Sequence, residues 1–184
     1  MKRVMDVVLS LLATVALAPL MLVTALAIVF EDGFPVLYRQ TRIGLGGREF
    51  SMFKFRSMTK NADKVGPYFT ATADSRITQV GRLIRKTSID ELPQLWNVVI
   101  GEMSLVGPRP DVPVQRGLYT DADWDQRCSV RPGITGLAQA LIRSGGSDGE
   151  RLRLDLRYTR ESSLWLDLKI MFWTLGRLSG KGAN

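Results

Sequence analysis

A long apolar run opens the sequence, because residues 7–30 form 24 consecutive positions without a charged side chain. As a helix rising ~1.5 Å per residue, this run measures ~36 Å and exceeds the ~30 Å hydrocarbon core of a bilayer. Lys2 and Arg3 before it and Ala25-Leu26-Ala27 within it resemble parts of a cleaved signal peptide, but the apolar region of such a peptide is shorter. A buried helix in a soluble protein is also shorter as a rule. The pattern therefore predicts a membrane segment.

The flanks and the centre of this run bear on its topology. Basic residues stand on both sides of it: Lys2, Arg3, Arg39, Arg42 and Arg48. Such residues mark the cytoplasmic side of a membrane, and here both flanks qualify. Pro19 lies near the middle of the run, where its missing N–H kinks or breaks a helix. These features fit a re-entrant helix-break-helix hairpin, but Pro is also tolerated in a spanning helix, so both topologies stay open.

The rest of the chain mixes two short strands with several helices. Residues 36–42 and 49–55 are rich in β-branched and aromatic side chains, and the glycine cluster between them is typical of a hairpin loop. Apolar spacing and proline positions predict helices over residues 77–86, 93–100, 150–160 and 164–175. We therefore expect an α+β fold, in which a compact, mostly helical domain carries a short β-hairpin and follows the N-terminal membrane segment.

The last of these helices has a strongly apolar face. Its apolar positions follow helical spacing: Leu164, Trp165, Leu168, Met171, Phe172 and Leu175. This face can pack into the core of the domain. Trp165 and Trp173 also fit an interfacial role, because tryptophan places an apolar ring beside a polar N–H at the membrane surface.

Composition excludes several kinds of chemistry. The 184 residues include no His and a single Cys, Cys128, so catalytic triads, His general bases, His-ligated metals, disulfides within the chain and cysteine zinc clusters are ruled out. Catalysis must use carboxylates, Lys, Tyr or hydroxyls, with a hard metal ion as the natural partner. A net charge of +7 favours anionic partners such as phosphates or an acidic membrane surface.

The most informative stretch runs from Arg85 to Gln94. Ser88 and Glu91 match the S-x-x-E capping box of a helix start. A regular helix from Ser88 would, however, place Pro93 at its fifth position, where the missing N–H costs a hydrogen bond. We therefore expect an irregular turn that lets Asp90 and its neighbour Glu91 converge. Paired carboxylates suit Mg²⁺, which takes one or two of them together with water and phosphate. An Asp carboxylate can also attack phosphorus.

These residues and others, taken in order, resemble the bacterial sugar transferase family, the small monotopic phosphoglycosyl transferases that start polysaccharide and glycoconjugate assembly. The matching stretches are Lys2-Arg3-x-x-Asp6, Gln40-x-Arg42-x-Gly44, Lys54-Phe55-Arg56-Ser57-Met58, Asp74-x-Arg76-Ile77-Thr78, Gly81-x-x-x-Arg85, Asp90-Glu91-Leu92-Pro93-Gln94, Gly107-Pro108-Arg109-Pro110, Arg131-Pro132-Gly133-Ile134-Thr135-Gly136, and Asp155-x-x-Tyr158 before Asp167-Leu168-Lys169-Ile170. Each is weak alone, but nine in one order cover nearly the whole chain.

The resemblance implies a ping-pong reaction. Asp90 attacks the β-phosphate of a UDP-sugar and releases UMP, and polyprenol phosphate then takes up the phosphosugar. Glu91 either holds Mg²⁺ together with Asp90 or assists proton transfer. The sugar and the oligomeric state are left open.

The resemblance also suggests residues that bind the substrates: Lys54, Arg85, Arg109, Arg131 and Asp155. Guanidinium groups bind phosphate in bidentate fashion. Each Arg could instead form a surface ion pair or cap a carbonyl, and Asp155 could pair with Arg151 one turn earlier.

By the same resemblance, residues 1–32 form a re-entrant membrane anchor. Residues 33–184 form a catalytic domain with interfacial amphipathic helices on the cytoplasmic face of the bacterial inner membrane. The partners expected are the UDP-sugar, polyprenol phosphate and the lipid bilayer.

Three other functions compete with this interpretation. A membrane-tethered adaptor that binds anionic lipid would not consume UDP-sugar. A glycoside hydrolase needs carboxyls ~5–9 Å apart, which adjacent residues converging on one ion do not provide. Nucleic-acid binding has only the net charge in its favour, since no recognised motif is present, and we expect no nucleic-acid partner.

Overall fold

The computed structural model describes residues 1–62, 74–142 and 146–178, with side chains described up to residue 176. In chain order the elements are α1 (Lys2–Asp32), β1 (Leu37–Ile43), η1 (Leu45–Gly47), β2 (Glu49–Phe55), α3 (Gln79–Lys86), η2 (Ile89–Glu91), α4 (Gln94–Ile100), β3 (Ser104–Val106), η3 (Pro113–Leu118), α5 (Asp121–Cys128), β4 (Gly133–Thr135), α6 (Leu137–Leu141), α7 (Asp148–Glu161) and α8 (Leu164–Leu178). The η elements are short 3₁₀ helices. The α+β class and the short hairpin are confirmed.

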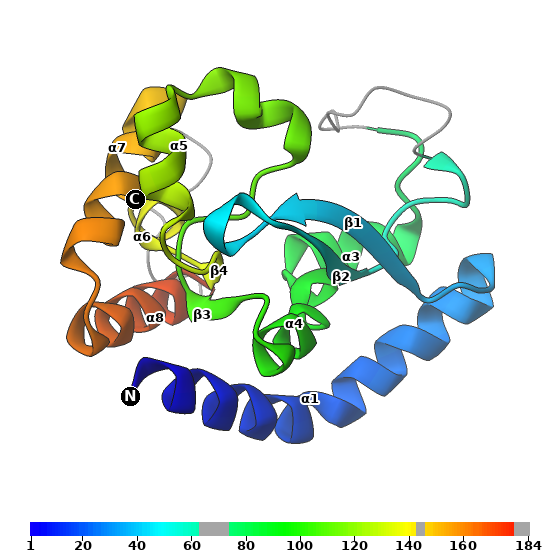
Figure 1. The fold of residues 1–184 in the computed structure, drawn as a ribbon. Helices are drawn as coiled ribbons and strands as arrows, with labels where there is room; N and C mark the ends of the chain where they lie inside the picture. The colour runs from blue at the N-terminus through cyan, green and yellow to red at the C-terminus, as the bar shows by residue number, and fades with distance from the viewer. Residues whose placement is uncertain (63–73, 143–145, 179–184) are drawn as a thin grey trace.

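Helix α1 lies along one side of the molecule, and the remaining elements stack above it (Figure 1). The β1–β2 hairpin is antiparallel, with Leu37 opposite Phe55 and Ile43 opposite Glu49. A second sheet, which the pattern did not predict, pairs β3 and β4 in parallel. It links the region of α3 and α4 to a helical group formed by α5, α6, α7 and α8 (Figure 1).

Local sequence explains where the helices begin and end. The Thr78 hydroxyl accepts a hydrogen bond of 2.9 Å from the Gly81 amide and so caps α3. Ser147 caps α7 in the same way, through the Glu150 amide. Such caps satisfy backbone donors that have no partner inside the helix. Helix α4 ends at Gly101, whose φ of 97° suits glycine because other residues are strained there.

The core consists of several small apolar clusters. One lies among β3, α6, α7 and α8: Val106, Leu137, Ala140, Tyr158 and Ile170. A second joins α1 to β2 and α3: Ile28, Phe55 and Ile84. A third lies between β2 and α4: Met52, Val98 and Met103. The carboxyl-terminal end of α1 is therefore part of the core of the domain.

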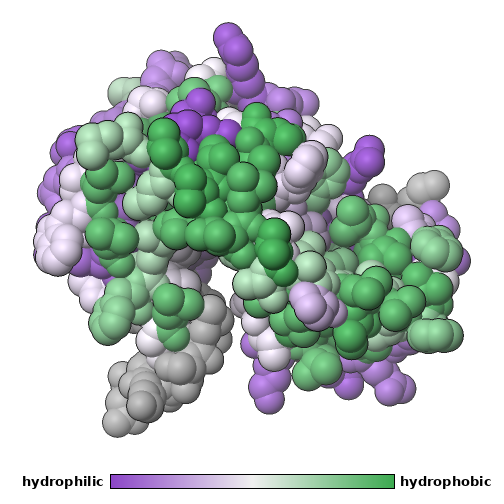
Figure 2. Space-filling view, turned by 90° about the horizontal axis from the view of Figure 1, so that it is seen from below, coloured by the Kyte–Doolittle hydropathy of each residue, from purple (hydrophilic) through white to green (hydrophobic). Residues whose placement is uncertain are grey.

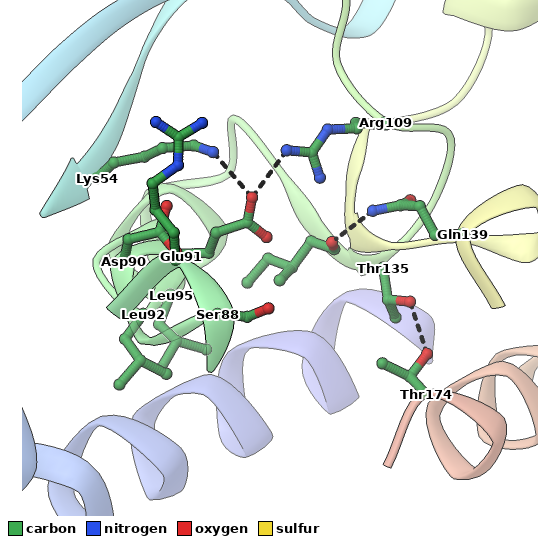
Figure 3. A pocket seen from close by; sticks show the side chains of 12 residues that line it. Lys54, Ser88, Asp90, Glu91, Leu92, Leu95, Arg109, Thr135, Gln139 and Thr174 are labelled. Carbon is green, nitrogen blue, oxygen red and sulfur yellow. Dashed lines mark hydrogen bonds and ion pairs between the residues drawn. The ribbon is translucent and has the colours of Figure 1, made fainter. Parts of the chain in front are cut away.

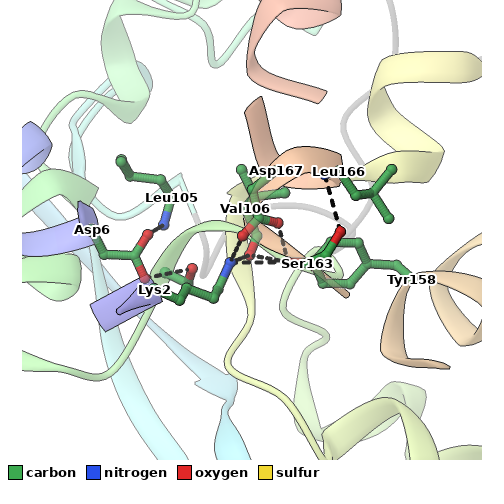
Figure 4. Close-up of polar contacts among 9 residues, drawn as sticks. Lys2, Asp6, Leu105, Val106, Tyr158, Ser163, Leu166 and Asp167 are labelled. Carbon is green, nitrogen blue, oxygen red and sulfur yellow. Dashed lines mark hydrogen bonds and ion pairs between the residues drawn. The ribbon is translucent and has the colours of Figure 1, made fainter. Parts of the chain in front are cut away.

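The amino-terminal end of α1 is held by buried polar contacts. The Lys2 ammonium lies 2.5 Å from the Asp167 carboxylate and 3.0 Å from the Tyr158 hydroxyl (Figure 4). Asp6 accepts hydrogen bonds from the Ser104 hydroxyl and the Leu105 amide. Asp167 and Asp6 are buried, and their contacts hold the helix end against the domain.

The other end of α1 is bound to the same domain. The Glu31 carboxylate accepts hydrogen bonds from the backbone amides of Gln79 and Val80 at the start of α3. Asp32 pairs with the buried Arg56 at 3.1 Å. Both ends of the membrane segment thus lie on one folded unit.

Of the kink or break expected at Pro19, the structure has a bend rather than an interruption of the helix (Figure 1). The helix runs from Lys2 to Asp32 with Pro19 inside it, and it bends near its middle (Figure 1). A proline removes one backbone hydrogen bond, which bends a helix that its neighbouring turns can still sustain. By length and apolar composition α1 is the one candidate membrane helix among the described residues.

The apolar stripe of α8 lies mostly outside the core. Trp165, Leu168, Phe172 and Leu175 are exposed, whereas Ile170 on the other side of the helix is fully buried. The core-packing interpretation of this stripe therefore holds for Met171, which packs against the core, but not for the four exposed residues. Seen from the side of α1, apolar side chains cover much of the molecular surface (Figure 2), and the exposed residues of α1 contribute to them. This face is suited to lipid.

Candidate active site

Asp90 and Glu91 lie on an irregular turn between α3 and α4. Ser88 has a positive φ of 59°, and one turn of 3₁₀ helix follows over Ile89–Glu91. The Ser88 side chain makes no capping hydrogen bond, so the predicted capping box is not formed. Pro93 stands directly before α4, where no helical donor is needed. The predicted irregular start is confirmed, and it turns both carboxylates toward one cavity.

This cavity has a volume of about 470 Å³. Its walls come from β2, the end of α3, the turn before α4, α4 itself, the loop after β3, β4, α6 and α8 (Figure 3). The lining residues are Lys54, Arg85, Ser88, Asp90, Glu91, Leu92, Leu95, Arg109, Ile134, Thr135, Gln139 and Thr174. Residues from positions 54 to 174 thus converge on one space.

Glu91 joins two basic side chains that reach it from opposite sides (Figure 3). Its Oε1 lies 2.8 Å from the Lys54 ammonium and 2.8 Å from the Arg109 guanidinium. Burial works against ionisation of Glu91, but the charges of Arg109 and Lys54 outweigh it and lower the pKa of Glu91 to about 2. Burial also lowers the pKa of Lys54, although Glu91 opposes this effect. The cluster therefore keeps Glu91 as an anion.

Asp90 is in a different state from its neighbour. Its side chain is buried, at 8% exposure, and burial raises the pKa of Asp90, with Lys54 opposing this rise. Within the described ranges its carboxylate has no hydrogen-bond or ion-pair partner. A desolvated carboxylate that faces a cavity is a good candidate nucleophile, because it has no hydrogen bond or ion pair to another described residue that would have to break before it reacts.

Five of the seven predicted site residues meet in this cavity: Lys54, Arg85, Asp90, Glu91 and Arg109. The other two lie elsewhere. Arg131 donates from Nε to the Gly101 carbonyl at 2.9 Å, and so acts as the carbonyl cap that the sequence also allowed. Neither Arg131 nor Asp155 lines the cavity.

Asp155 is buried in an ion pair with Arg127, at 3.0 Å, rather than with Arg151 as the helix spacing suggested. Burial raises the pKa of Asp155 to about 6, although the charge of Arg127 opposes the rise. Its position therefore gives no support to direct nucleotide binding.

Sequence reasoning missed the uncharged wall of the cavity. The Thr135 and Thr174 hydroxyls lie 2.7 Å apart, and the Gln139 amide donates to the Ile134 carbonyl at 3.0 Å. Thr135 belongs to a stretch that matched the family, which was the one available signal. Thr174 and Gln139 had no signal, because only the fold brings α6 and α8 to the cavity (Figure 3). Hydroxyl and amide groups suit the hydroxyls of a sugar.

The oxygen ligands available for a metal ion are few. Among the described residues no group of three or more His, Cys, Asp or Glu side chains gathers to hold one. Asp90 and Glu91 supply two adjacent carboxylates in the cavity, and Mg²⁺ usually takes one or two carboxylates together with water and substrate phosphate. The donor set thus fits Mg²⁺.

The sequence model of the bacterial sugar transferase family matches residues 1–181. The chain belongs to this family. An undecaprenyl-phosphate glucose phosphotransferase of Komagataeibacter xylinus is 47% identical over 96% of this chain and 35% of its own length. A UDP-glucose:undecaprenyl-phosphate glucose-1-phosphate transferase of Caulobacter vibrioides is 45% identical over 96% of this chain and 69% of its own length.

A third relative carries a different sugar in its name. The UDP-N-acetylgalactosamine-undecaprenyl-phosphate N-acetylgalactosaminephosphotransferase of Aeromonas hydrophila is 42% identical over 100% of this chain and 45% of its own length. The chain thus spans less than half the length of two of these three relatives.

Proposed function

We propose that the protein transfers a sugar-1-phosphate from a UDP-sugar to polyprenol phosphate through a covalent intermediate on Asp90. One observation carries this proposal. Asp90 is buried without a hydrogen-bond or ion-pair partner among the described residues, and in the same cavity Glu91 binds Lys54 and Arg109. The names of the family relatives support the class of donor and acceptor. The proposed reaction needs neither an imidazole nor a thiolate, which agrees with a chain that has no His and a single Cys.

In the first half-reaction, a carboxylate oxygen of Asp90 attacks the β-phosphorus of the UDP-sugar. A bond forms between this oxygen and phosphorus, and the bond from phosphorus to the bridging oxygen breaks, so that UMP leaves with the electron pair. In the second, a phosphate oxygen of polyprenol phosphate attacks the same phosphorus. The bond to Asp90 then breaks, and the carboxylate is restored. Neither step requires a proton from the protein.

The basic residues of the cavity have a clear role in this scheme. Lys54, Arg85 and Arg109 line the same cavity as Asp90, and their charges favour a diphosphate whose negative charge shifts to the leaving UMP. The uncharged wall with Thr135 and Thr174 offers hydrogen bonds to the sugar. Asp90 and Glu91 would hold Mg²⁺, which supplies Lewis-acid stabilisation of the phosphate oxygens.

The docking of both ends of α1 supports a re-entrant anchor. Lys2 and Asp32 are each tied to the same folded unit. A helix that crossed the bilayer would place them on opposite sides of the membrane, which the single unit cannot reach. We therefore place the domain on the cytoplasmic face of the inner membrane, where its cavity lies near the phosphate of a polyprenol.

The proposed reaction is tested by UMP release from UDP-glucose, UDP-galactose and UDP-N-acetylgalactosamine, with polyprenol phosphate and Mg²⁺. We expect turnover with at least one donor, loss of turnover in Asp90→Asn, and wild-type activity in the exposed control Asp125→Asn. Without acceptor, at most one UMP per enzyme should appear, together with a phosphosugar adduct on the peptide that contains Asp90. An adduct on another residue contradicts the assignment. A non-enzymatic adaptor predicts no consumption of any donor, and removal of Mg²⁺ with chelator tests the metal.

The anchor is tested by cysteine labelling in intact cells. A cysteine placed before Lys2 and a second in Phe34→Cys, at an exposed position, should both resist an impermeant maleimide from outside. Both should react in inside-out vesicles. Labelling of the amino-terminal cysteine from outside would show a spanning helix.

A further inference from the structure

Arg109 reaches the cavity from an exposed loop. Its guanidinium binds Glu91 at 2.8 Å, although its side chain is 47% exposed. Arg109 follows β3 and belongs to no helix or strand. An exposed loop is ordinarily the least rigid part of a fold. Something must therefore hold this loop in place if Arg109 is to meet the substrate in a fixed geometry.

The backbone of this loop is tethered at every carbonyl from residue 108 to residue 111. The bonds, from donor to carbonyl, run from the Gly133 amide to Pro108 at 2.9 Å, from the Arg127 guanidinium to Arg109 at 2.7 Å, from the Arg42 guanidinium to Pro110 at 2.8 Å, and from the Ile43 amide to Asp111 at 2.8 Å. The prolines on both sides of Arg109 also restrict its backbone. The bond to the Arg109 carbonyl itself comes from Arg127.

Arg127 is fixed by two acidic residues, Asp155 on α7 and Asp111 in the loop that carries Arg109. Its buried guanidinium binds Asp155 of α7 through Nε, at 3.1 Å, and Asp111 through NH1. The third nitrogen, NH2, donates to the Arg109 carbonyl. A guanidinium is planar and rigid, so acceptors on its different nitrogens fix the direction of each bond. Asp155 thus orients Arg127 from outside the loop, while Asp111 and the Arg109 carbonyl bind the loop to Arg127.

Stability alone does not explain this cluster. Arg127, Asp111 and Asp155 are all at least nine-tenths buried, and together they bring one positive and two negative charges out of water. Well-packed apolar side chains of similar volume commonly stabilise a protein as much or more. Burial raises the pKa of Asp155 and of Asp111, which reflects the cost of keeping both as anions. What the charged groups provide here is a fixed direction for the hydrogen bonds of the Arg127 guanidinium.

We infer that Arg127, oriented by Asp155 and Asp111, is a positioning residue that places Arg109 beside Glu91 at the cavity. This inference rests on the proposed function, since it assigns Arg109 to the phosphosugar-transfer site. It also gives Asp155 an indirect role in place of direct binding to nucleotide. Asp155 contacts Arg127, and Arg127 contacts Arg109, which lines the cavity.

The test is a double-mutant cycle on kcat/KM for UMP release by the full chain. If Arg127 acts through Arg109, Arg127→Lys should lower kcat/KM by about 10- to 100-fold, because misplacement by about 1 Å can cost that much. Lysine retains the charge that balances the two acids but cannot donate in three fixed directions. Arg127→Gln should have at least the same effect. In an Arg109→Ala background, either replacement should lower kcat/KM by no more than about twofold.

A merely structural role makes a different prediction. If Arg127 only stabilises the fold, its effect multiplies with that of Arg109→Ala, and the inference is overturned. Wild-type kcat/KM in Arg127→Lys overturns it as well. Should Arg127→Gln fail to fold, Arg127→Lys still decides the question, and melting curves report the folded fraction of each variant.

The matched control is Arg157→Lys, since Arg157 forms an exposed ion pair with Glu161 on α7. This variant should stay within about twofold of wild type. Failure of this inference can be distinguished from failure of the proposed function, because in the second case the wild type itself releases no UMP.

Discussion

The contact between Lys2 and Asp167 predicts a large effect for a residue at the very start of the chain. Replacing Lys2 by Met removes the ammonium that lies 2.5 Å from the Asp167 carboxylate. Asp167 is fully buried and keeps a hydrogen bond of 2.6 Å from the Tyr158 hydroxyl. Removing one partner of a buried ion pair costs about 3–5 kcal/mol. Because the Lys2 side chain is 36% exposed, water screens part of this interaction, and we expect a loss of about 2 kcal/mol.

This loss can be measured as an apparent melting temperature in detergent or nanodiscs. For a chain of this length, about 2 kcal/mol corresponds to a decrease of about 4–8 °C. Lys169→Met, which removes an exposed ammonium from the same helix as Asp167, serves as the control and should shift the temperature by no more than about 2 °C.

A double-mutant cycle identifies the partner. In an Asp167→Asn background, Lys2→Met should cost much less than in the wild type, because no buried carboxylate is then left without its cation. A melting temperature unchanged in Lys2→Met would refute the reasoning. So would equal effects of Lys2→Met in both backgrounds.

Three further outcomes are expected. Thr174→Val removes the hydroxyl that bonds to Thr135 in the uncharged wall, and should lower kcat/KM for the sugar donor by about 3- to 10-fold, with an unchanged melting temperature; no change in kcat/KM would remove this wall from the binding site. Burial raises the pKa of Asp155 to about 6 against the opposing charge of Arg127, so between pH 4 and 6 the folded protein holds a proton that the unfolded chain has lost. Stability should therefore fall as pH rises through this window. Asp155→Asn should flatten this slope by up to about 3 kcal/mol across the window, as measured by denaturant unfolding at each pH, and an identical slope would contradict the raised pKa. Phe172 is 74% exposed on α8, and Phe172→Gln should weaken vesicle binding by about tenfold or more in co-sedimentation, while unchanged binding would show that this face does not enter the membrane.

The turn at Asp90 and Glu91 was predictable because its cause is local. Pro93 cannot donate a backbone hydrogen bond, so a regular helix from Ser88 was excluded by the sequence itself. The structure has a positive φ at Ser88 and α4 beginning at Gln94, after the proline. The same local reasoning predicted the β1–β2 hairpin within one residue of its observed bounds.

The sequence left the roles of Arg131 and Asp155 open, because a side chain's partner depends on distant parts of the chain. The Asp155 carboxylate meets Arg127, 28 residues earlier, rather than Arg151 on its own helix. Arg131 meets the Gly101 carbonyl, 30 residues earlier. In the sequence both residues look like substrate ligands, because a charged residue that contacts other parts of the protein cannot be distinguished there from one that binds the substrate.

The sequence by itself determined the membrane helix, the irregular carboxylate turn and the chemistry left to a chain without His. These follow from the length of the apolar run, from the position of Pro93 and from the residue composition. None of the three depends on contacts between distant parts of the chain. The tertiary structure decided which face of α8 is exposed, how both ends of α1 meet one domain, and which residues share the cavity with Asp90. These features depend on contacts between segments far apart in the chain, and only packing brings such segments together.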